Sequence, residues 1–546
     1  MTEKAVDGLF DVFSNKFAQD IFIQKYSMDK QEKWEHTCKR VVESVCGQLL
    51  DNETKEKIFN LILERKFIPG GRYLYSAGRP FHQVNNCFLF RADDSREGWA
   101  DIMYKITMSL MTGGGIGVDY SGIRKSGAII RRTGGECTGP IALMEMVNEA
   151  GRHIMQGGAR RSAIWAGLNW KHGDIFDFLN LKDWDSSLRE LKSKDLNFRL
   201  PMEGTNISVI YDTEFFVAIK DKKHPLHKHS KEVWKKNCGQ AFSTAEPGMS
   251  FNFLKDNESL RNACTEVTSE DDSDKCNLGT MWINRFENKE DFAEGCSLAT
   301  KFLICGGLYS DIPTDLIKEV GEKNNRIGLG LGGIHEWLMM RGYKYQVTPE
   351  LHKWLNLYEQ ESDAAAYITA KDLNVAIPKG KRAIAPTGTI GILAETTTGI
   401  EPLFCKAYKR RYLVGNKWKT QYVVDGTVKR LLDRGVKIED IQDAYDISFK
   451  ERVKFQADVQ NYVDMSISST CNLPAWGSED NNEENIDKNA KILLKYGQRL
   501  RGFTCYPDGA RGGQPLTRVS LDDALKKEGI VYEESEHECI GGVCGL

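Results

Sequence analysis

Three polar residues alternate along one short stretch of the sequence, Asn262-Ala263-Cys264-Thr265-Glu266. In an extended segment, residues two apart point to the same side, so an amide, a thiol and a carboxylate would share one face. On a sugar, the amide can bind a hydroxyl group, the carboxylate can remove its proton, and the thiol can exchange a hydrogen atom. Taken alone, such a pattern is more often a polar surface loop with a buried cysteine.

Other cysteines accompany this stretch. A Cys276-Asn277-Leu278-Gly279 segment follows it, Cys87 lies far upstream in an Asn-Cys pair, and Cys539 and Cys544 stand close to the end of the sequence. The chain has 14 cysteines, and in a reducing compartment most of them are expected to be buried thiols without a chemical role. A chemical role therefore has to rest on their arrangement.

The ordered set of motifs resembles the large subunits of ribonucleotide reductases. The resemblance covers about residues 65 to 515, in the order in which that family has its motifs. Three further stretches agree with it: Pro386-Thr387-Gly388-Thr389-Ile390-Gly391, Gly399-Ile400-Glu401-Pro402-Leu403-Phe404, and Val463-Asp464 followed by Cys471-Asn472-Leu473-Pro474.

The resemblance implies a catalytic role for five residues. Cys264 would become the thiyl radical that takes the 3'-hydrogen of the ribose. Glu266 would be the base for the 3'-hydroxyl, and Asn262 would hold the sugar. Cys87 and Cys276 would deliver two electrons and end as a disulfide, which agrees with the chemistry of a dithiol as a two-electron reductant.

Two cysteines near the end of the sequence would serve this internal pair. By the resemblance, Cys539 and Cys544 reduce the internal disulfide by exchange and are themselves reduced by a thioredoxin- or glutaredoxin-like protein. Three glycines in the last six residues predict a mobile end, which suits a shuttle. Two unused thiols are the alternative. A zinc site is disfavoured because no second cysteine pair lies near, and no metal ligands are predicted elsewhere.

Nucleotide-binding residues are also implied by the resemblance. Those expected to bind the ribonucleotide substrate are Asn86, Gly114, Gly115, Pro386, Thr387, Gly388, Thr389 and Ile390. A Pro-Thr-Gly-Thr turn that opens a helix offers N–H groups and hydroxyls to phosphate, with a plain helix cap as the alternative. Those expected to bind a deoxynucleoside triphosphate effector are Asp94, Ser95, Arg124 and Arg160, with solvated surface side chains as the alternative. Arg160 belongs to a glycine-containing loop, residues 156–162, that would link effector to substrate.

Adenosylcobalamin is the expected source of the radical. Reductases that depend on a metal-containing partner subunit receive the radical through two adjacent tyrosines, whereas the matching stretch here has Tyr506 beside Cys505. The stretches 114–121 and 508–511 are also more similar to the cobalamin-dependent type. The alternatives are a catalytic subunit served by a metal-containing partner, a nucleotide-binding regulator that kept the fold, and, more distantly, a nicotinamide dehydrogenase.

The elements that must position these residues are expected to form an α/β fold. Apolar residues such as Trp34, Cys38 and Val41 have helical spacing, and strong breakers end that segment near residue 71. From about 80 to 510, short apolar stretches alternate with amphipathic ones. The resemblance makes this a ten-stranded α/β barrel with Cys264 on a central finger loop. The predicted domains are a helical N-terminal domain (1–75), the catalytic barrel (76–515) and a flexible C-terminal redox tail (516–546).

Two glycine-rich stretches could be mistaken for nucleotide-binding loops. Residues 328–333 fit the dinucleotide-binding pattern, but no βαβ unit is evident around them. Residues 113–117 lack the Lys-Ser/Thr ending of a triphosphate-binding loop. They indicate a place where the backbone approaches a ligand or another segment closely.

Composition and charge narrow the class of protein. The chain of 546 residues is 41% hydrophobic and 28% charged, as in soluble globular proteins. Its net charge of -3 predicts no nucleic-acid-binding surface, although Lys409-Arg410-Arg411 could hold phosphates. No membrane span and no secretory leader are expected, which predicts a cytoplasmic protein. We expect a homodimer, because no large insertion imitates a partner subunit. We expect no overall on/off control by adenine nucleotides, because no nucleotide-binding cone precedes the helical segment.

Overall fold

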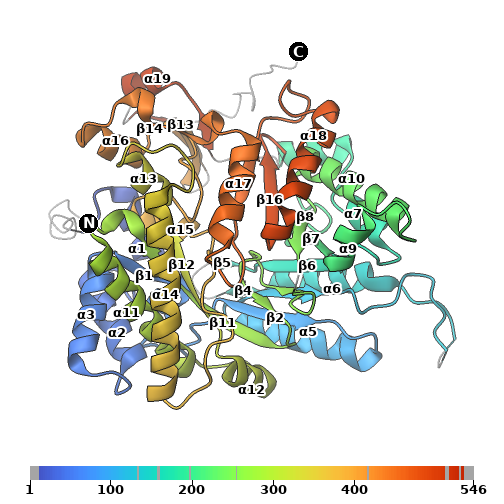
Figure 1. The fold of residues 1–546 in the computed structure, drawn as a ribbon, viewed down its shortest axis with the longest axis horizontal. Coiled ribbons are helices and arrows are strands. Elements are labelled where there is room, and N and C mark those ends of the chain that lie inside the picture. Colours follow the sequence, from blue (N-terminus) through green and yellow to red (C-terminus); the bar gives the residue numbers. More distant parts are fainter. Residues whose placement is uncertain are drawn as a thin grey trace.

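A computed structural model describes residues 12–131, 134–156, 160–195, 198–253, 255–414, 417–510, 516–527 and 530–533. Strands occupy the middle of the molecule and helices lie around them (Figure 1). A ten-stranded mixed sheet dominates the fold, which confirms the predicted α/β class. No helix in the described ranges is long and apolar enough to cross a membrane.

One half of the barrel is a set of parallel strands in the order β2, β3, β6, β7, β8. Their bounds are Cys87–Arg91, Gly115–Asp119, Ile164–Asn169, Thr205–Tyr211 and Gly248–Phe251. Helices cover their outer face, namely α5 (Arg96–Met111), α6 (Gly139–His153), α7 (Ile175–Asn180), α9 (Thr213–Ala218) and α10 (His227–Thr244), whereas α8 (Ser186–Lys194) has no buried residue among those described. The strands are almost wholly buried, as parallel strands covered on both faces are.

The other half runs in the opposite direction, since β11 pairs antiparallel with β2, and β16 pairs antiparallel with β8. Its strands are β11 (Asp274–Trp282), β12 (Ile327–Gly332), β15 (Thr470–Leu473) and β16 (Gly502–Pro507). Its helices are α11 (Lys289–Tyr309), α12 (Asp315–Asn324), α13 (Ile334–Met339), α14 (Pro349–Asp372), α15 (Gly388–Ala394), α17 (Phe449–Gln460) and α18 (Glu483–Tyr496).

Two single bridges close the barrel. Leu329 of β12 pairs with Arg382, and Ile384 pairs with Ile467 just before β15, both in parallel. The closed ring is therefore β2, β3, β6, β7, β8, β16, β15, the segment 381–384, β12 and β11, which is ten members. Strand β1 (Phe67–Pro69) pairs with β11 and stands outside this ring. The predicted ten-stranded barrel is confirmed.

A hairpin between β8 and β11 enters the barrel as the predicted finger loop. Its two short strands are β9 (Leu260–Arg261) and β10 (Thr268–Ser269), which pair antiparallel. Strand β3 makes room for it, because a Cβ atom at Gly117 would lie 1.8 Å from the carbonyl oxygen of Arg261. The glycine run 113–117 thus serves, at Gly117, the close backbone approach that its composition predicted.

The N-terminal segment is helical as predicted, over its described residues. It comprises α1 (Lys16–Lys25), α2 (Trp34–Cys46), α3 (Asn52–Leu63) and α4 (Gly71–Ser76). In α2 the buried residues include Trp34, Cys38 and Val41, which have helical spacing in the sequence. These helices share one hydrophobic core with α11, α14, β11 and β12, so the barrel wall supplies part of their apolar partner surface.

A small lobe lies at the upper left of Figure 1. Its four-stranded sheet has the order β17-β13-β14-β18, built from Leu516–Arg518, Ala407–Val414, Lys417–Val424 and Val531–Glu533, with α16 (Gly426–Asp433) and α19 (Leu521–Lys527) against it. Residues 516–527 and 530–533 are therefore folded into this lobe, whereas a flexible tail was predicted from residue 516. Pairing with β13 and β14 is the reason, and sequence patterns do not reveal it.

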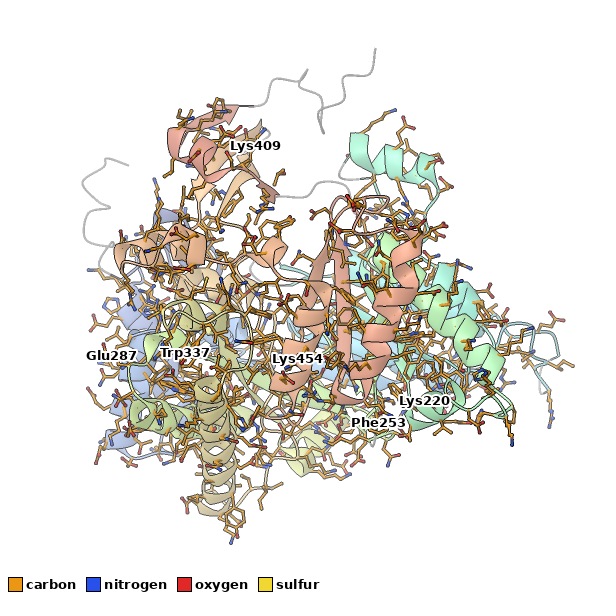
Figure 2. All side chains as sticks on the ribbon, turned by 45° about the horizontal axis from the view of Figure 1, so that its top comes forward. Lys220, Phe253, Glu287, Trp337, Lys409 and Lys454 are labelled. Atoms are coloured by element: carbon orange, nitrogen blue, oxygen red, sulfur yellow. The ribbon has the colours of Figure 1, made fainter. Side chains whose placement is uncertain are left out.

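The remaining elements are short. They are the hairpin β4 (Met155–Gln156) and β5 (Arg160–Arg161), and the 3₁₀ turns Ile283–Arg285, Ile438–Asp440, Ala444–Asp446 and Gly497–Arg499. Lys409, in the basic stretch 409–411, lies on β13 of the small lobe, at the top of the molecule in Figure 2.

Candidate active site

The tip of the finger loop holds the Asn-x-Cys-x-Glu stretch in a turn. The Thr265 N–H donates to the Asn262 carbonyl at 3.0 Å, and Thr265 has a left-handed φ of 69°. The prediction of an extended segment is therefore wrong, because the chain has to reverse its direction inside the barrel. Asn262 and Glu266 are each only 2% exposed, while Cys264 is partly exposed at the tip.

Barrel strands bring the two other predicted cysteines together. Cys87 opens β2, Cys276 lies in β11, and the two are directly opposite each other in the antiparallel pairing of these strands. Residues opposite each other in such a pair have Cα atoms roughly 4.5–5.5 Å apart, which lies within the range that disulfides span. Both thiols are free and buried. The structure therefore places a reduced pair where a disulfide can form.

Asn262 ties the finger loop to this pair. Its Nδ2–H donates to the Cys87 Sγ at 2.9 Å, and its Oδ1 accepts from the Val267 N–H at 3.0 Å. Burial raises the pKa of the Cys87 thiol most, and Glu266, Cys276 and Cys264 lie close enough that a negative charge on any of them would raise it further. Cys264 thus lies near the facing pair of Cys87 and Cys276 inside the barrel.

Burial sets the protonation of this cluster. It raises the pKa of the thiols of Cys264, Cys87 and Cys276 well above the ordinary value, so all three are protonated near neutral pH. A protonated thiol can give a hydrogen atom, whereas a thiolate would act as a nucleophile. Burial also raises the pKa of Glu266 to about 7. Its Oε2 is buried and finds no hydrogen-bond partner among the described residues, so it can accept a proton from a bound molecule.

The predicted substrate residues Asn86, Gly114 and Gly115 lie where β2 and β3 begin. The N–H of Gly115 donates to the Asn86 carbonyl at 2.8 Å, and that of Gly114 donates to the Ser109 carbonyl at 3.2 Å. The Asn86 side-chain oxygen accepts from the Leu278 N–H at 3.2 Å. A Cβ at Gly115 would lie 3.2 Å from the Ala263 side chain. These backbone groups bind protein. Gly115 leaves room for the finger loop, and Gly114 leaves room for the Phe88 ring, which a Cβ would approach to 2.1 Å.

The predicted phosphate-binding turn, residues 386–390, follows the closing segment 381–384. Pro386 and Gly388 are exposed, whereas Thr387 and Ile390 are buried. Thr387 adopts a left-handed φ of 52°, and its hydroxyl accepts from the Gly399 N–H at 3.0 Å. A Cβ at Gly388 would meet no atom of the described residues within 4 Å, so among these residues open space faces the turn there.

Two of the predicted effector residues bind each other. The Arg124 Nε–H donates to the Asp94 carboxylate at 2.7 Å. Ser95 caps α5, where its hydroxyl accepts from the Gly98 N–H at 2.9 Å. Arg160 lies in β5 opposite Gln156, and residues 157–159 of the loop between these strands are outside the described residues. Cys539 and Cys544 also lie outside the described residues.

The residues that fix the finger loop at its base were not predicted from the sequence. The buried Arg261 binds several carbonyl groups, Glu258 pairs with Arg501 at 2.7 Å, and the Ser259 hydroxyl donates to Asp119 at 2.6 Å. The Arg501 charge contributes to a low pKa of about 2 for Glu258, despite its burial. The only feature of the sequence that could have pointed to these residues is that Arg261 directly precedes Asn262.

The second glycine motif is a barrel strand. Residues 328–332 belong to β12, where Gly330 packs against the Ala383 carbonyl and Gly332 packs against Trp282. The glycines therefore serve strand packing, which agrees with the chance match to a dinucleotide pattern.

A family model described as the ribonucleotide reductase barrel domain matches residues 85–242, 211–357 and 381–506. The chain belongs to the ribonucleotide reductase family. A vitamin B12-dependent ribonucleoside-diphosphate reductase of Thermoplasma acidophilum is 26% identical, over 86% of this chain and 67% of that one. One of the same name from Mycobacterium tuberculosis (strain CDC 1551 / Oshkosh) is 24% identical, over 90% of this chain and 76% of that one.

Two further proteins are similar to this chain. A putative adenosylcobalamin-dependent ribonucleoside-triphosphate reductase of Mycobacterium phage D29 is 26% identical, over 84% of this chain and 76% of that one. The class Id ribonucleotide reductase alpha subunit of Actinobacillus ureae superposes with a TM-score of 0.71 at 15% identity, covering 91% of this chain and 97% of that chain. The solved structure supports the fold, and the family assignment rests on the match to the barrel-domain model.

Proposed function

We propose that this reductase converts ribonucleoside di- or triphosphates to 2'-deoxyribonucleotides, with a thiyl radical on Cys264 that is generated from adenosylcobalamin. The observation that carries the proposal is the meeting of Cys87 and Cys276 on facing strands, beside Cys264 and the unpaired carboxylate oxygen of Glu266. The names of the relatives support the choice of cofactor.

Each residue at the tip has one task in this proposal. The Cys264 sulfur takes the 3'-hydrogen from the ribose and returns it at the end of the cycle. Glu266 accepts the proton of the 3'-hydroxyl at Oε2, and Asn262 holds the sugar and the Cys87 thiol in register. A buried base with a pKa of about 7 is poised to accept and release a proton near neutral pH.

The two thiols supply the electrons and the hydrogen that the reduction requires. The bond between C2' and its hydroxyl oxygen breaks, and that oxygen leaves as water. Cys87 and Cys276 together give up two electrons and two protons and become joined by a disulfide, so the sugar gains hydrogen at C2'. Their cross-strand pairing lets this bond form without a large movement of the barrel wall.

The described residues fit the proposed cofactor in one respect. When bound, adenosylcobalamin supplies a carbon radical by homolysis of its cobalt–carbon bond. The Cys264 thiol, protonated and partly exposed at the loop tip, can give a hydrogen atom to an outside radical. Cys505 beside Tyr506 in β16 also departs from the two adjacent tyrosines expected of the type served by a partner subunit.

Nucleotide sites are proposed on the residues identified by resemblance. Asn86, Gly114, Gly115 and the turn 386–390 would hold the substrate, and the exposed Gly388 is where phosphate can approach the backbone. A deoxynucleoside triphosphate effector would bind Asp94, Ser95, Arg124 and Arg160 by replacing the ion pair between Asp94 and Arg124.

Partners follow from the same scheme. Cys539 and Cys544 would pass electrons from a thioredoxin- or glutaredoxin-like protein to the internal disulfide. A second copy of the chain would bind the outer face of α5 and α6, where Tyr104, Met111 and Met146 are exposed.

The deciding experiment measures deoxynucleotide formation by the purified chain with a dithiol reductant, with and without adenosylcobalamin. We expect product only with the cofactor, together with a coupled cobalt–thiyl signal in electron paramagnetic resonance that Cys264→Ala abolishes. Product that forms only with a separate metal-containing subunit would instead establish the alternative, a catalytic subunit that receives its radical from that partner. The Actinobacillus ureae class Id alpha subunit has a similar fold. Nucleotide binding without any reduction would establish a non-catalytic regulator.

A further inference from the structure

The base of the finger loop is built around the guanidinium of Arg261. This side chain is fully buried. It donates to the carbonyl groups of Glu258 (2.5 Å), Leu260 (2.9 Å), Phe251 (3.2 Å) and Arg501 (3.3 Å) and to the Asn252 Oδ1 (2.7 Å). Burying a guanidinium is costly unless such bonds compensate for lost hydration, so the site is specific for this side chain.

The oxygen atoms that Arg261 binds come from separate parts of the fold. Phe251 ends β8, Asn252 follows it, and Arg501 directly precedes β16. Strands β8 and β16 form one of the two junctions between the halves of the barrel, the other being β2 and β11. The Arg261 side chain therefore joins β9, the first strand of the finger loop, to both halves of the barrel.

Arg261 also limits the position of the loop through its backbone. Its carbonyl oxygen lies where a Cβ on Gly117 would be, in contact with β3. Asn262 directly follows Arg261, and Cys264 stands three residues after Arg261, at the turn. A shift of Arg261 would therefore move the Asn262–Cys87 contact and the Cys264 sulfur together.

We propose that Arg261 is the positioning residue of Cys264, which fixes the depth of the finger loop in the barrel and thereby the place of its thiol. This rests on the proposed function. The five oxygen atoms to which the Arg261 side chain donates all belong to residues outside the predicted nucleotide-binding set. Loss of the side chain is therefore expected to affect the chemical step and to leave nucleotide binding unchanged.

The experiment compares Arg261→Met, Arg261→Lys and the control Arg499→Met. Arg499 lies two residues before Arg501 and binds Asp458 at 2.6 Å, with 41% of its side chain exposed. Each variant is assayed for kcat and KM, for its melting temperature, and for the rate at which iodoacetamide alkylates Cys264, resolved by peptide mass spectrometry. Alkylation of Cys137, which lies outside the site, serves as the internal standard.

For Arg261→Met we expect kcat to fall roughly 100-fold with an unchanged KM, as for a misplacement of reacting groups by about 1 Å. Cys264 alkylation should rise several-fold relative to Cys137. Arg261→Lys, which keeps the charge and part of the hydrogen bonding, should recover part of both effects, and Arg499→Met should match the wild type.

A folded Arg261→Met that keeps the wild-type kcat and the wild-type alkylation rate of Cys264 would overturn the positioning role. So would a loss confined to KM. If Arg261→Met does not fold, Arg261→Lys and Arg261→Gln decide the matter with the same measurements. If the wild type makes no deoxynucleotide but alkylation of Cys264 still responds to Arg261, the proposed function fails and the structural clamp stands.

Discussion

Glu266 is the residue whose ionisation should set the pH dependence of the reaction. As the base it must be ionised, and its pKa of about 7 means that ionisation is completed only above neutral pH. We expect kcat/KM to rise with pH through about 7 and to level off above it, because kcat/KM reports the free enzyme. Glu266→Gln should lose most of the activity, and its kcat/KM should no longer rise with pH. A wild-type profile that is flat from pH 6 to pH 8 would contradict this role.

The same carboxyl group should lower stability at neutral and higher pH. Its folded-state pKa lies above the ordinary value of 4.5, so the folded state binds more protons than the unfolded state between those values. Stability therefore falls as pH rises from about 4.5 to 7, by up to about 3 kcal/mol in total. Glu266→Gln should raise the free energy of unfolding at pH 8 but not at pH 4. Denaturant unfolding measures this, with the exposed Glu287→Gln (Figure 2) as the unaffected control.

Cys276 can be tested by counting thiols after one turnover. In the wild type, a single turnover without external reductant should consume two titratable thiols, because Cys87 and Cys276 become a disulfide. Cys276→Ser should form no deoxynucleotide and lose no thiol pair, while still binding nucleotide. Cys137→Ser, away from the site, should behave as the wild type does. Product with two thiols lost in Cys276→Ser would exclude it as an electron donor.

At the scale of elements, β3 and the finger loop fit together only because Gly117 lacks a side chain. Gly117→Ala would place a Cβ 1.8 Å from the Arg261 carbonyl, so β3 or the loop must move. We expect a loss of about 1–3 kcal/mol in the free energy of unfolding, together with a lower kcat, measured by denaturant unfolding and turnover.

A matched substitution separates crowding from the general effect of alanine. Gly239 lies inside α10, and a Cβ there would have its nearest contact at 3.7 Å, to the Ile486 Cδ1. Gly239→Ala should be neutral or should stabilise the protein by up to about 1 kcal/mol, because alanine favours helix over glycine. Equal effects at the two glycines would contradict the close packing at β3.

At the scale of the whole molecule, α5 links the proposed effector site to the proposed dimer. Asp94 and Ser95 stand at its beginning, and Tyr104 and Met111 expose 56% and 60% of their surface further along it. Tyr104 and Met111 are seven residues apart and thus lie on one face of the helix. Two copies of the chain could bury this face against each other.

Charge on that face should therefore prevent dimer formation. We expect Tyr104→Glu combined with Met111→Glu to be monomeric in sedimentation experiments, under conditions where the wild type is a dimer. Val217→Glu, which changes a 51% exposed residue on α9, should leave the dimer intact. A wild type that remains monomeric at micromolar concentration, with and without effector, would refute the proposed dimer.

Sequence by itself determined the local features. Helical spacing of Trp34, Cys38 and Val41 sufficed for α2, because burial on one helix face follows a local period. The types and order of the cysteines and of Glu266 sufficed to select the family and to nominate the site residues. Helical spacing lies within a short stretch of the chain, and the order of the motifs can be read along it without knowing how the chain folds.

Only the tertiary structure decided what depends on distant segments. Cys87 and Cys276 face each other because β2 pairs with β11, a strand far away in the sequence, and the reversal at Thr265 comes from confinement inside the barrel. The pKa of Glu266 follows from burial that no spacing specifies, and the clamp at Arg261 depends on carbonyl groups of β8 and of the residue before β16. Residue types are local, whereas burial, pairing and desolvation arise only when remote parts of the chain pack together.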